Sequence, residues 1–335
     1  MREPRFWARD VDPKSREAAP LLRFLLSPVA WAYATATRRK IARATPHNVH
    51  ASVICIGNLT AGGVGKSTVV AALRAQIQTT YSVRVAPLSR GYKGKLSGPL
   101  QVDPETHTAS DVGDEPLMLS ASGEAWIGAD RAAAGRAMSD AGGDVILMDD
   151  GHQNPGLAKD LSLIVVDSAM GFGNGFVIPK GPLREPVLEG LARADAIIVL
   201  GDANPPAILH DSDRPIFKGK VVPASAPPPG AYVAFAGIGR PEKFFDTLNA
   251  LDVDVRDAVP FPDHHTFSVG DYRYLRQLAA DHDARLITTE KDLARLQQSE
   301  RADIATLPIR IQIERFEALD KMIANVIKPS GHESD

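Results

Sequence analysis

The chain has 335 residues, 44% of them hydrophobic and 24% charged, and its formal net charge at pH 7 is −3. This is the composition of a globular protein long enough for two ordinary domains. The slightly acidic balance lacks the signature of a polyanion-binding protein, so nucleic acid is not an expected partner.

The first feature along the chain is an apolar N-terminal segment. Residues 18–36 are mostly apolar but contain Arg23 and Pro28. A membrane-spanning helix needs about 20 apolar residues, so we do not expect a span, and the segment does not resemble a cleaved signal peptide. A basic cluster follows at residues 38–43. The pattern is typical of a helix lying in the membrane interface, with its cations near anionic headgroups. A helix packed on the protein's own core is the alternative.

Apolar strands then alternate with helical stretches. The single cysteine, Cys55, lies in the first of these strands, where packing is its expected role, and its lack of a disulfide partner fits a cytoplasmic compartment. The alternation predicts an α/β fold: a P-loop NTPase-like, mostly parallel sheet with helices on both faces. Strands are expected at residues 52–56, 83–88, 144–148, 163–166 and 196–200, and helices at 68–77, 123–141 and 187–194.

A break in composition precedes a second alternating pattern. Residues 201–215 and 223–230 are rich in Pro, Asp and Ala, as linkers often are. Strands at 232–238, 285–288 and 309–313, with helices at 242–248 and 272–280, then predict a smaller C-terminal α/β lobe. We therefore divide the chain into an N-terminal membrane-docking segment (1–45), a P-loop core (46–215), a linker (216–231) and a C-terminal lobe (232–335) that closes on the site between the lobes.

The strongest local signal is a glycine-rich segment between the first strand and the first helix of the core, the context that a P-loop requires. Glycines let the backbone N–H groups turn toward phosphate oxygens, and the helix N-terminus adds a positive dipole end. Lys66 is expected to reach the β- and γ-phosphates of a nucleotide, and Ser67 to bind Mg²⁺. The predicted nucleotide-binding residues are Thr60, which replaces the first glycine of the general pattern, Ala61, Gly62, Gly63, Val64, Gly65, Lys66, Ser67 and Thr68.

Charged residues at other strand ends could complete such a site. Asp149 and Asp150 end a predicted strand and would face the P-loop as metal ligands, although they could instead cap a turn. Arg90 follows another strand and is a candidate clamp on a phosphate group. Arg184 and Glu185 lie in a loop shaped by Gly and Pro, for which a solvated surface loop is the alternative.

Two further clusters favour a kinase over a nucleotide switch. Asp114 and Glu115 are adjacent carboxylates, and Asp263 precedes two histidines. A carboxylate with a His can accept the proton of an attacking hydroxyl. The guanine-reading segment of a GTPase is poorly matched at residues 290–292. The alternative is a P-loop switch or metallochaperone acting on a protein partner, which the apolar N-terminus and the lack of a Cys/His cluster disfavour.

Taken together, these motifs resemble the tetraacyldisaccharide 4′-kinase family, the lipid A 4′-kinases of Gram-negative bacteria. The resemblance implies transfer of the γ-phosphate of ATP, with Mg²⁺, to the 4′-hydroxyl of an acylated glucosamine disaccharide 1-phosphate, giving lipid IVA. The family accepts Thr at the position of Thr60, but residues 152–156 depart from its usual pattern. The motifs occur in one collinear order at residues 57–60, 62–67, 89–92, 113–116, 149–153, 173–175, 181–186, 235–239, 261–264 and 289–292.

The resemblance also implies roles for individual residues. Asp114 and His264 would together deprotonate the 4′-hydroxyl, with Asp263 supporting His264. Arg184 and Glu185 match a functional motif without a defined role. The acidic surround of Mg²⁺ would be Glu115, Asp149 and Asp150.

The acceptor implied by this resemblance carries acyl chains in the bilayer, which favours the membrane-interface interpretation of the N-terminal segment. We therefore expect a peripheral or monotopic enzyme on the cytoplasmic face of the inner membrane, with no obligate protein partner.

Overall fold

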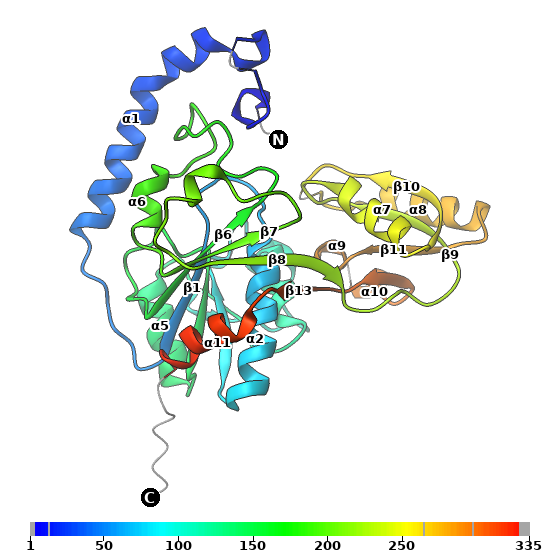
Figure 1. Ribbon diagram of the computed structural model, residues 1–335. Helices are drawn as coiled ribbons and strands as arrows, with labels where there is room; N and C mark the ends of the chain where they lie inside the picture. The colour runs from blue at the N-terminus through cyan, green and yellow to red at the C-terminus, as the bar shows by residue number, and fades with distance from the viewer. Residues whose placement is uncertain (1–3, 13, 264, 297, 328–335) are drawn as a thin grey trace, which may run out of the picture.

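The computed structural model describes residues 4–12, 14–263, 265–296 and 298–327. The predicted catalytic residue His264 therefore lies outside the described residues. Figure 1 shows two α/β lobes side by side, with one long N-terminal helix along the outside of the larger lobe.

The larger lobe is built on a nine-stranded sheet that is parallel except at its two edges. The edge strands run antiparallel to their neighbours, and the strands between them are parallel. In spatial order the strands are β13 (Ile309–Ile313), β8 (Ile216–Pro223), β7 (Ala196–Leu200), β6 (Leu161–Asp167), β1 (Ser52–Gly57), β5 (Val145–Asp149), β2 (Val85–Ser89), β4 (Trp126–Ile127) and β3 (Leu100–Gln101).

Helices cover both faces of this sheet. Every residue of β1, β2, β5, β6 and β7 is buried, as expected for parallel strands with helices on each side. Helices α2 (Lys66–Tyr81) and α11 (Phe316–Ala324) pack on one face. Helices α5 (Arg131–Asp140) and α6 (Val187–Leu191) pack on the other. The predicted mostly parallel sheet with helices on both faces is confirmed.

The smaller lobe is a four-stranded parallel sheet in the order β10 (Asp254–Pro260), β9 (Ala231–Ala236), β11 (Arg285–Thr289), β12 (Ile304–Leu307). Helices α7 (Pro241–Ala250) and α8 (Val269–Asp281) contribute to separate core clusters on this sheet. The remaining short elements are α3 (Ala109–Val112), α4 (Asp114–Ser120), α9 (Glu290–Arg295), α10 (Gln298–Arg301), η1 (Arg5–Trp7), η2 (Arg16–Ala18) and η3 (Ala207–Leu209).

The boundary between the lobes differs from the sequence prediction. Residues 216–223, expected to belong to a linker, form strand β8 of the larger sheet, because Phe217 packs into the core on one face of the sheet and Ile216 packs against the core on the other. The C-terminal end also returns to the larger lobe, since β13 pairs with β8 and Leu319 and Ile323 of α11 enter the larger core. The chain therefore crosses between the lobes twice, after β8 and after β12.

The N-terminal helix α1 (Pro20–Arg43) leaves most of its apolar side chains in solvent. Its one buried residue is Ala30. A helix packed on the protein's own core would bury these side chains, so the structure does not support that alternative. Within the described part of the chain, no helix is long and apolar enough to cross a membrane. The exposed side chains are Leu21, Leu22, Phe24, Leu25, Val29, Trp31 and Tyr33.

Candidate active site

The candidate active site lies at the carboxyl edge of the larger sheet. Strand β1 leads into the P-loop, β5 ends at Asp149, and β2 ends beside Arg90. Because β5 pairs in parallel with both β1 and β2, these three strand ends meet at one edge. Such an edge is where ligands bind in open α/β sheets.

The P-loop is attached to the loop that carries Arg184. The Ala61 N–H donates to the Pro182 carbonyl at 2.7 Å, and the Arg184 N–H donates to the Leu59 carbonyl at 2.8 Å. Thr60 is buried, and its carbonyl accepts a hydrogen bond from the Asn58 side chain at 2.8 Å. The bond from Asn58 to Thr60 therefore holds the start of the P-loop, and the two backbone hydrogen bonds place Arg184 next to it, near Asp150.

Glycine conformation opens the other end of the P-loop. Gly65 has φ = +85°, a left-handed conformation that turns the chain into α2 at Lys66. A Cβ placed on Gly63 would meet no atom within 4 Å. That open space lies beside the helix N-terminus, where phosphate groups bind favourably.

Asp150 is held by two cations. Its carboxylate lies 3.3 Å from Nζ of Lys66 and accepts hydrogen bonds from Nη1 of Arg184, at 2.9 Å to each oxygen. Burial opposes ionisation of this carboxyl, but Lys66 and Arg184 outweigh it and keep the pKa of Asp150 below its usual value. Asp150 is thus a carboxylate that is already neutralised by the protein.

Asp149 is in the opposite electrostatic situation. Its Oδ2 accepts a hydrogen bond from Oγ of Ser67 at 3.3 Å, while its buried Oδ1 has no partner within the described ranges. Burial, followed by the nearby charge of Glu115, raises the pKa of Asp149 to about 7. A buried carboxylate oxygen next to a hydroxyl and a phosphate-binding loop fits Mg²⁺, which favours one or two carboxylates plus substrate phosphates.

No group of three or more His, Cys, Asp or Glu side chains that could hold a metal occurs among the residues that the structure describes. Asp149 and Ser67 fit a Mg²⁺ ion that takes its other ligands from nucleotide phosphates and water.

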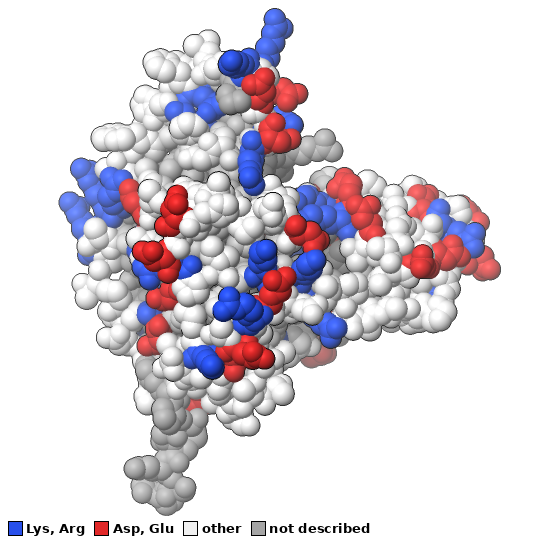
Figure 2. Space-filling view, in the orientation of Figure 1, with Lys and Arg blue, Asp and Glu red and all other residues white. Residues whose placement is uncertain are grey.

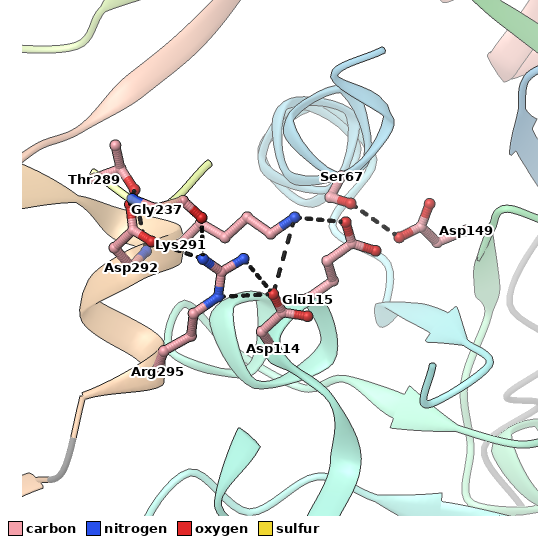
Figure 3. A network of polar contacts seen from close by, with 9 residues as sticks. All are labelled: Ser67, Asp114, Glu115, Asp149, Gly237, Thr289, Lys291, Asp292 and Arg295. Atoms are coloured by element: carbon pink, nitrogen blue, oxygen red, sulfur yellow. Dashed lines mark hydrogen bonds and ion pairs between the residues drawn. The ribbon is translucent and has the colours of Figure 1, made fainter. Parts of the chain in front are cut away.

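A network of ion pairs joins the two lobes beside this edge (Figure 3). Arg295 of α9, in the smaller lobe, donates to Oδ2 of Asp114 from Nε at 2.9 Å and from Nη2 at 2.6 Å. Lys291 of the same helix lies 3.1 Å from Oε1 of Glu115 and 3.9 Å from Oδ2 of Asp114. Both predicted carboxylates of α4 therefore face cations from the other lobe.

A second interlobe ion pair was not predicted from the sequence. Asp167, at the end of β6, pairs with Arg240, and Nζ of Lys243 lies 3.5 Å from its Oδ2. Burial opposes ionisation of Asp167, but backbone N–H groups and Arg240 keep its pKa below the usual value.

The predicted histidine segment lies in the smaller lobe, between β10 and α8. Asp263 is exposed there. The neighbouring His265 stacks on Phe261 with ring centroids 4.7 Å apart, and its Nε2 lies 3.0 Å from Oδ2 of Asp271. His265 is thus held within its own lobe.

Arg184 and Glu185 point to different partners. The buried Glu185 accepts hydrogen bonds from Gln153 at 2.9 Å and from Arg193 at 2.6 Å. It therefore fixes the loop rather than reaching the P-loop lysine. His152 is also buried, its Nε2 lies 2.9 Å from the Gly190 carbonyl, and burial lowers its pKa to about 3. The atypical segment at residues 152–156 thus begins with a packing residue.

Arg90 is exposed, and its charge acts on the buried Arg131 at the start of α5. Burial lowers the pKa of Arg131 to about 10, an effect that Asp149 and Asp150 oppose and Arg90 reinforces. Sequence reasoning missed Arg131 because it lies in an Ala-rich helix without a recognisable motif.

Comparisons with known proteins agree with one another. The model of the tetraacyldisaccharide-1-P 4′-kinase family matches residues 22–328. A protein of Hyphomonas neptunium named tetraacyldisaccharide 4′-kinase is 54% identical over 331 residues, which cover 99% of each chain. A protein of the same name from Maricaulis maris is 49% identical over 334 residues, covering 98% of this chain and 97% of its own. A crystal structure of LpxK from Aquifex aeolicus in complex with ATP matches with a TM-score of 0.73 and 25% identity, covering 92% of this chain and 100% of that one.

Proposed function

The chain belongs to the tetraacyldisaccharide-1-P 4′-kinase family, and we propose that its phosphoryl transfer takes place between the P-loop and Asp114. The protein is a kinase that uses ATP to phosphorylate the 4′-hydroxyl of the acylated disaccharide 1-phosphate in lipid A biosynthesis. A nucleotide switch or metallochaperone is not favoured. The observation that supports the proposed location is the convergence of Lys66, Asp149 and the α4 carboxylates at one sheet edge.

The proposed roles follow from the contacts of each side chain. Lys66 and the first turn of α2 would bind the nucleotide phosphates, with Arg184 holding Asp150 in place. Asp149 and Ser67 would hold Mg²⁺, which neutralises charge on the transferred phosphoryl group. Asp114, together with His264, would accept the proton of the 4′-hydroxyl.

Phosphotransfer from labelled ATP to the disaccharide 1-phosphate tests these roles. We expect Lys66→Met and Asp114→Asn to abolish turnover while their thermal unfolding stays cooperative. Asp140→Asn, an exposed aspartate on α5, is the matched control and should retain wild-type turnover. Near-normal activity of Asp114→Asn would contradict its assignment as the proton acceptor.

We also propose that residues 1–45 dock the enzyme on the cytoplasmic face of the inner membrane. The exposed apolar side chains of α1 support this, as does the gathering of Lys and Arg over its C-terminal part (Figure 2). Such a helix would bury its apolar side chains at the level of the headgroups, with its cations near anionic lipid.

The loop after β6 extends this surface. Nε1 of Trp7 donates to the Pro179 carbonyl at 3.0 Å, and Asn174 donates to the Phe6 carbonyl at 2.7 Å, so the N-terminal segment is fastened to the loop. Phe176, 36% exposed, lies beneath the Arg23 guanidinium at 4.9 Å. The helix and the loop thus present one continuous surface.

Flotation with vesicles containing anionic phospholipid tests the docking proposal. Phe24→Glu places a charge on a side chain that is 74% exposed and should reduce vesicle binding markedly. Val269→Glu changes a side chain of the smaller lobe that is 64% exposed and should bind like the wild type. Equal binding by the two variants would contradict docking through α1.

A further inference from the structure

Arg295 makes an unusually specific contact across the two lobes. Two of its three donor nitrogens, Nε and Nη2, donate to the same oxygen of Asp114, Oδ2, at 2.9 and 2.6 Å. The Arg295 side chain is only 5% exposed. Because a guanidinium is planar and its donors are fixed relative to one another, two bonds to one oxygen fix where that carboxylate oxygen lies.

The smaller lobe orients this arginine before it reaches Asp114. Nη1 of Arg295 donates to the Gly237 carbonyl at 2.6 Å and to Oδ1 of Asp292 at 2.7 Å. Asp292 is fully buried and is itself held by the Gly237 N–H at 3.0 Å and the Thr289 hydroxyl at 2.7 Å. Gly237 and Thr289 lie at the ends of β9 and β11, so the carboxyl edge of the smaller sheet sets the direction of the arginine (Figure 3).

We propose that Arg295 is a positioning residue for Asp114 and that Asp292 acts through it. The proposal rests on the role proposed above for Asp114. Asp114 is the first residue of α4 in the larger lobe, whereas its orienting partner comes from α9 in the smaller one. The carboxylate therefore takes up its working orientation only when the lobes adopt this arrangement. Lobe closure and the geometry of the proton acceptor are in this way coupled through one side chain.

The second interlobe ion pair offers a matched control. Arg240 of the smaller lobe also pairs with a buried carboxylate at a strand end of the larger lobe, Asp167. Arg240 pairs with Asp167, so its loss weakens the attachment between the lobes without removing the two hydrogen bonds from Arg295 to Asp114. Comparing the effects of losing each arginine therefore separates the positioning of Asp114 from the attachment of one lobe to the other.

The experiment measures kcat and the KM for ATP in the full-length variants Arg295→Met, Arg295→Lys, Asp292→Asn and Arg240→Met. Misplacement of a reacting group by about 1 Å can cost about 100-fold in rate. We therefore expect kcat to fall about 100-fold in Arg295→Met, and less in Arg295→Lys and Asp292→Asn, with the KM for ATP changed by less than about 3-fold. Arg240→Met should keep kcat within about 3-fold of the wild type. Cooperative melting and ATP binding identify the folded variants.

A double variant makes the test specific. In a protein that already carries Asp114→Ala, Arg295→Met should cause no further loss of the residual rate, because residues that act as a unit are not additive. An equal additional loss would overturn the proposal. A kcat for Arg295→Met equal to that of Arg240→Met would also overturn it. If Arg295→Met does not fold, the same comparison is made with Arg295→Lys and Asp292→Asn.

A wrong assignment of Asp114 as the proton acceptor would give a different set of results. If Asp114→Ala retained near-normal turnover, the role of Asp114 would be wrong and the inference would fall with it. If Asp114→Ala were inactive and Arg295→Met fully active, only the inference would fail.

Discussion

Replacing Asp149 by Asn should stabilise the protein in the absence of metal. The carboxyl is buried, and its pKa is raised from 3.8 to about 7 by burial and by Glu115. Below pH 3.8 the residue is protonated in both the folded and the unfolded state. Between pH 3.8 and 7 the unfolded state ionises while the folded state keeps its proton, so stability falls as the pH rises, and above pH 7 the full difference is expressed.

The magnitude follows from the size of this change. One pKa unit corresponds to about 1.4 kcal/mol, so ionised Asp149 destabilises the metal-free protein by about 4 kcal/mol at pH 8. Asn has the same shape, and its amide can donate to the Ser67 hydroxyl in place of the present bond. The free energy of unfolding of Asp149→Asn should therefore exceed that of the wild type at pH 8, and the gap should close toward pH 4.

Thermal unfolding in EDTA at several pH values between 4.5 and 8 measures this gap, with Asp140→Asn as the exposed control. Adding Mg²⁺ and ATP should stabilise the wild type more than Asp149→Asn, because a ligand stabilises only the protein that binds it. An Asp149→Asn protein less stable than the wild type at pH 8 in EDTA would refute the reasoning, as would a gap that does not depend on pH.

Three other substitutions test separate features. Gly63→Ala should leave the unfolding free energy within about 0.5 kcal/mol of the wild type but raise the KM for ATP, since its Cβ enters open space beside the P-loop; a large fall in melting temperature would contradict this. Arg184→Gln removes one of two cations from Asp150 and should lower kcat/KM about 10–100-fold, and unchanged kinetics would argue against a supporting role. The wild type should lose stability as the pH falls from 6.5 toward 3, by at most about 1.4 kcal/mol per pH unit, because the buried His152 resists protonation, and His152→Gln should not show this loss. Identical melting temperatures of wild type and variant at pH 7 and at pH 5 would count against this prediction.

The central strands could be predicted from the sequence because each is an apolar run buried on both faces, as in β1 and β7. Strands β8 and β10 could not. In β8 only part of the strand is buried, and β10 is an edge strand with mostly exposed residues. Edge and half-buried strands often carry charged residues, so they leave no apolar run to recognise. For this reason β8 was assigned to the linker and not to the larger lobe.

The candidate site divides in a similar way. Parallel strands bring their ends together, so the meeting of the P-loop with Asp149 and Asp150 could be predicted from chain order. The partners of Asp114 could not, because Arg295 lies 181 positions away along the chain, in the other lobe. Its contact depends on how the two lobes pack against one another, and no local sequence pattern contains that information.

The balance of charge at the site explains why one carboxylate differs from its neighbours. Asp150 is paired with Lys66, Asp114 with Arg295 and Glu115 with Lys291. Asp149 alone of these four carboxylates has no ion pair within the described part of the chain, and it is the one whose pKa is raised to about 7. A buried carboxylate without a cation either keeps a proton or binds a metal ion. Asp149 thus places a buried carboxylate at the point of the sheet edge where Mg²⁺ with a nucleotide would supply the compensating positive charge, and proton loss from Asp149 would accompany binding of the ion.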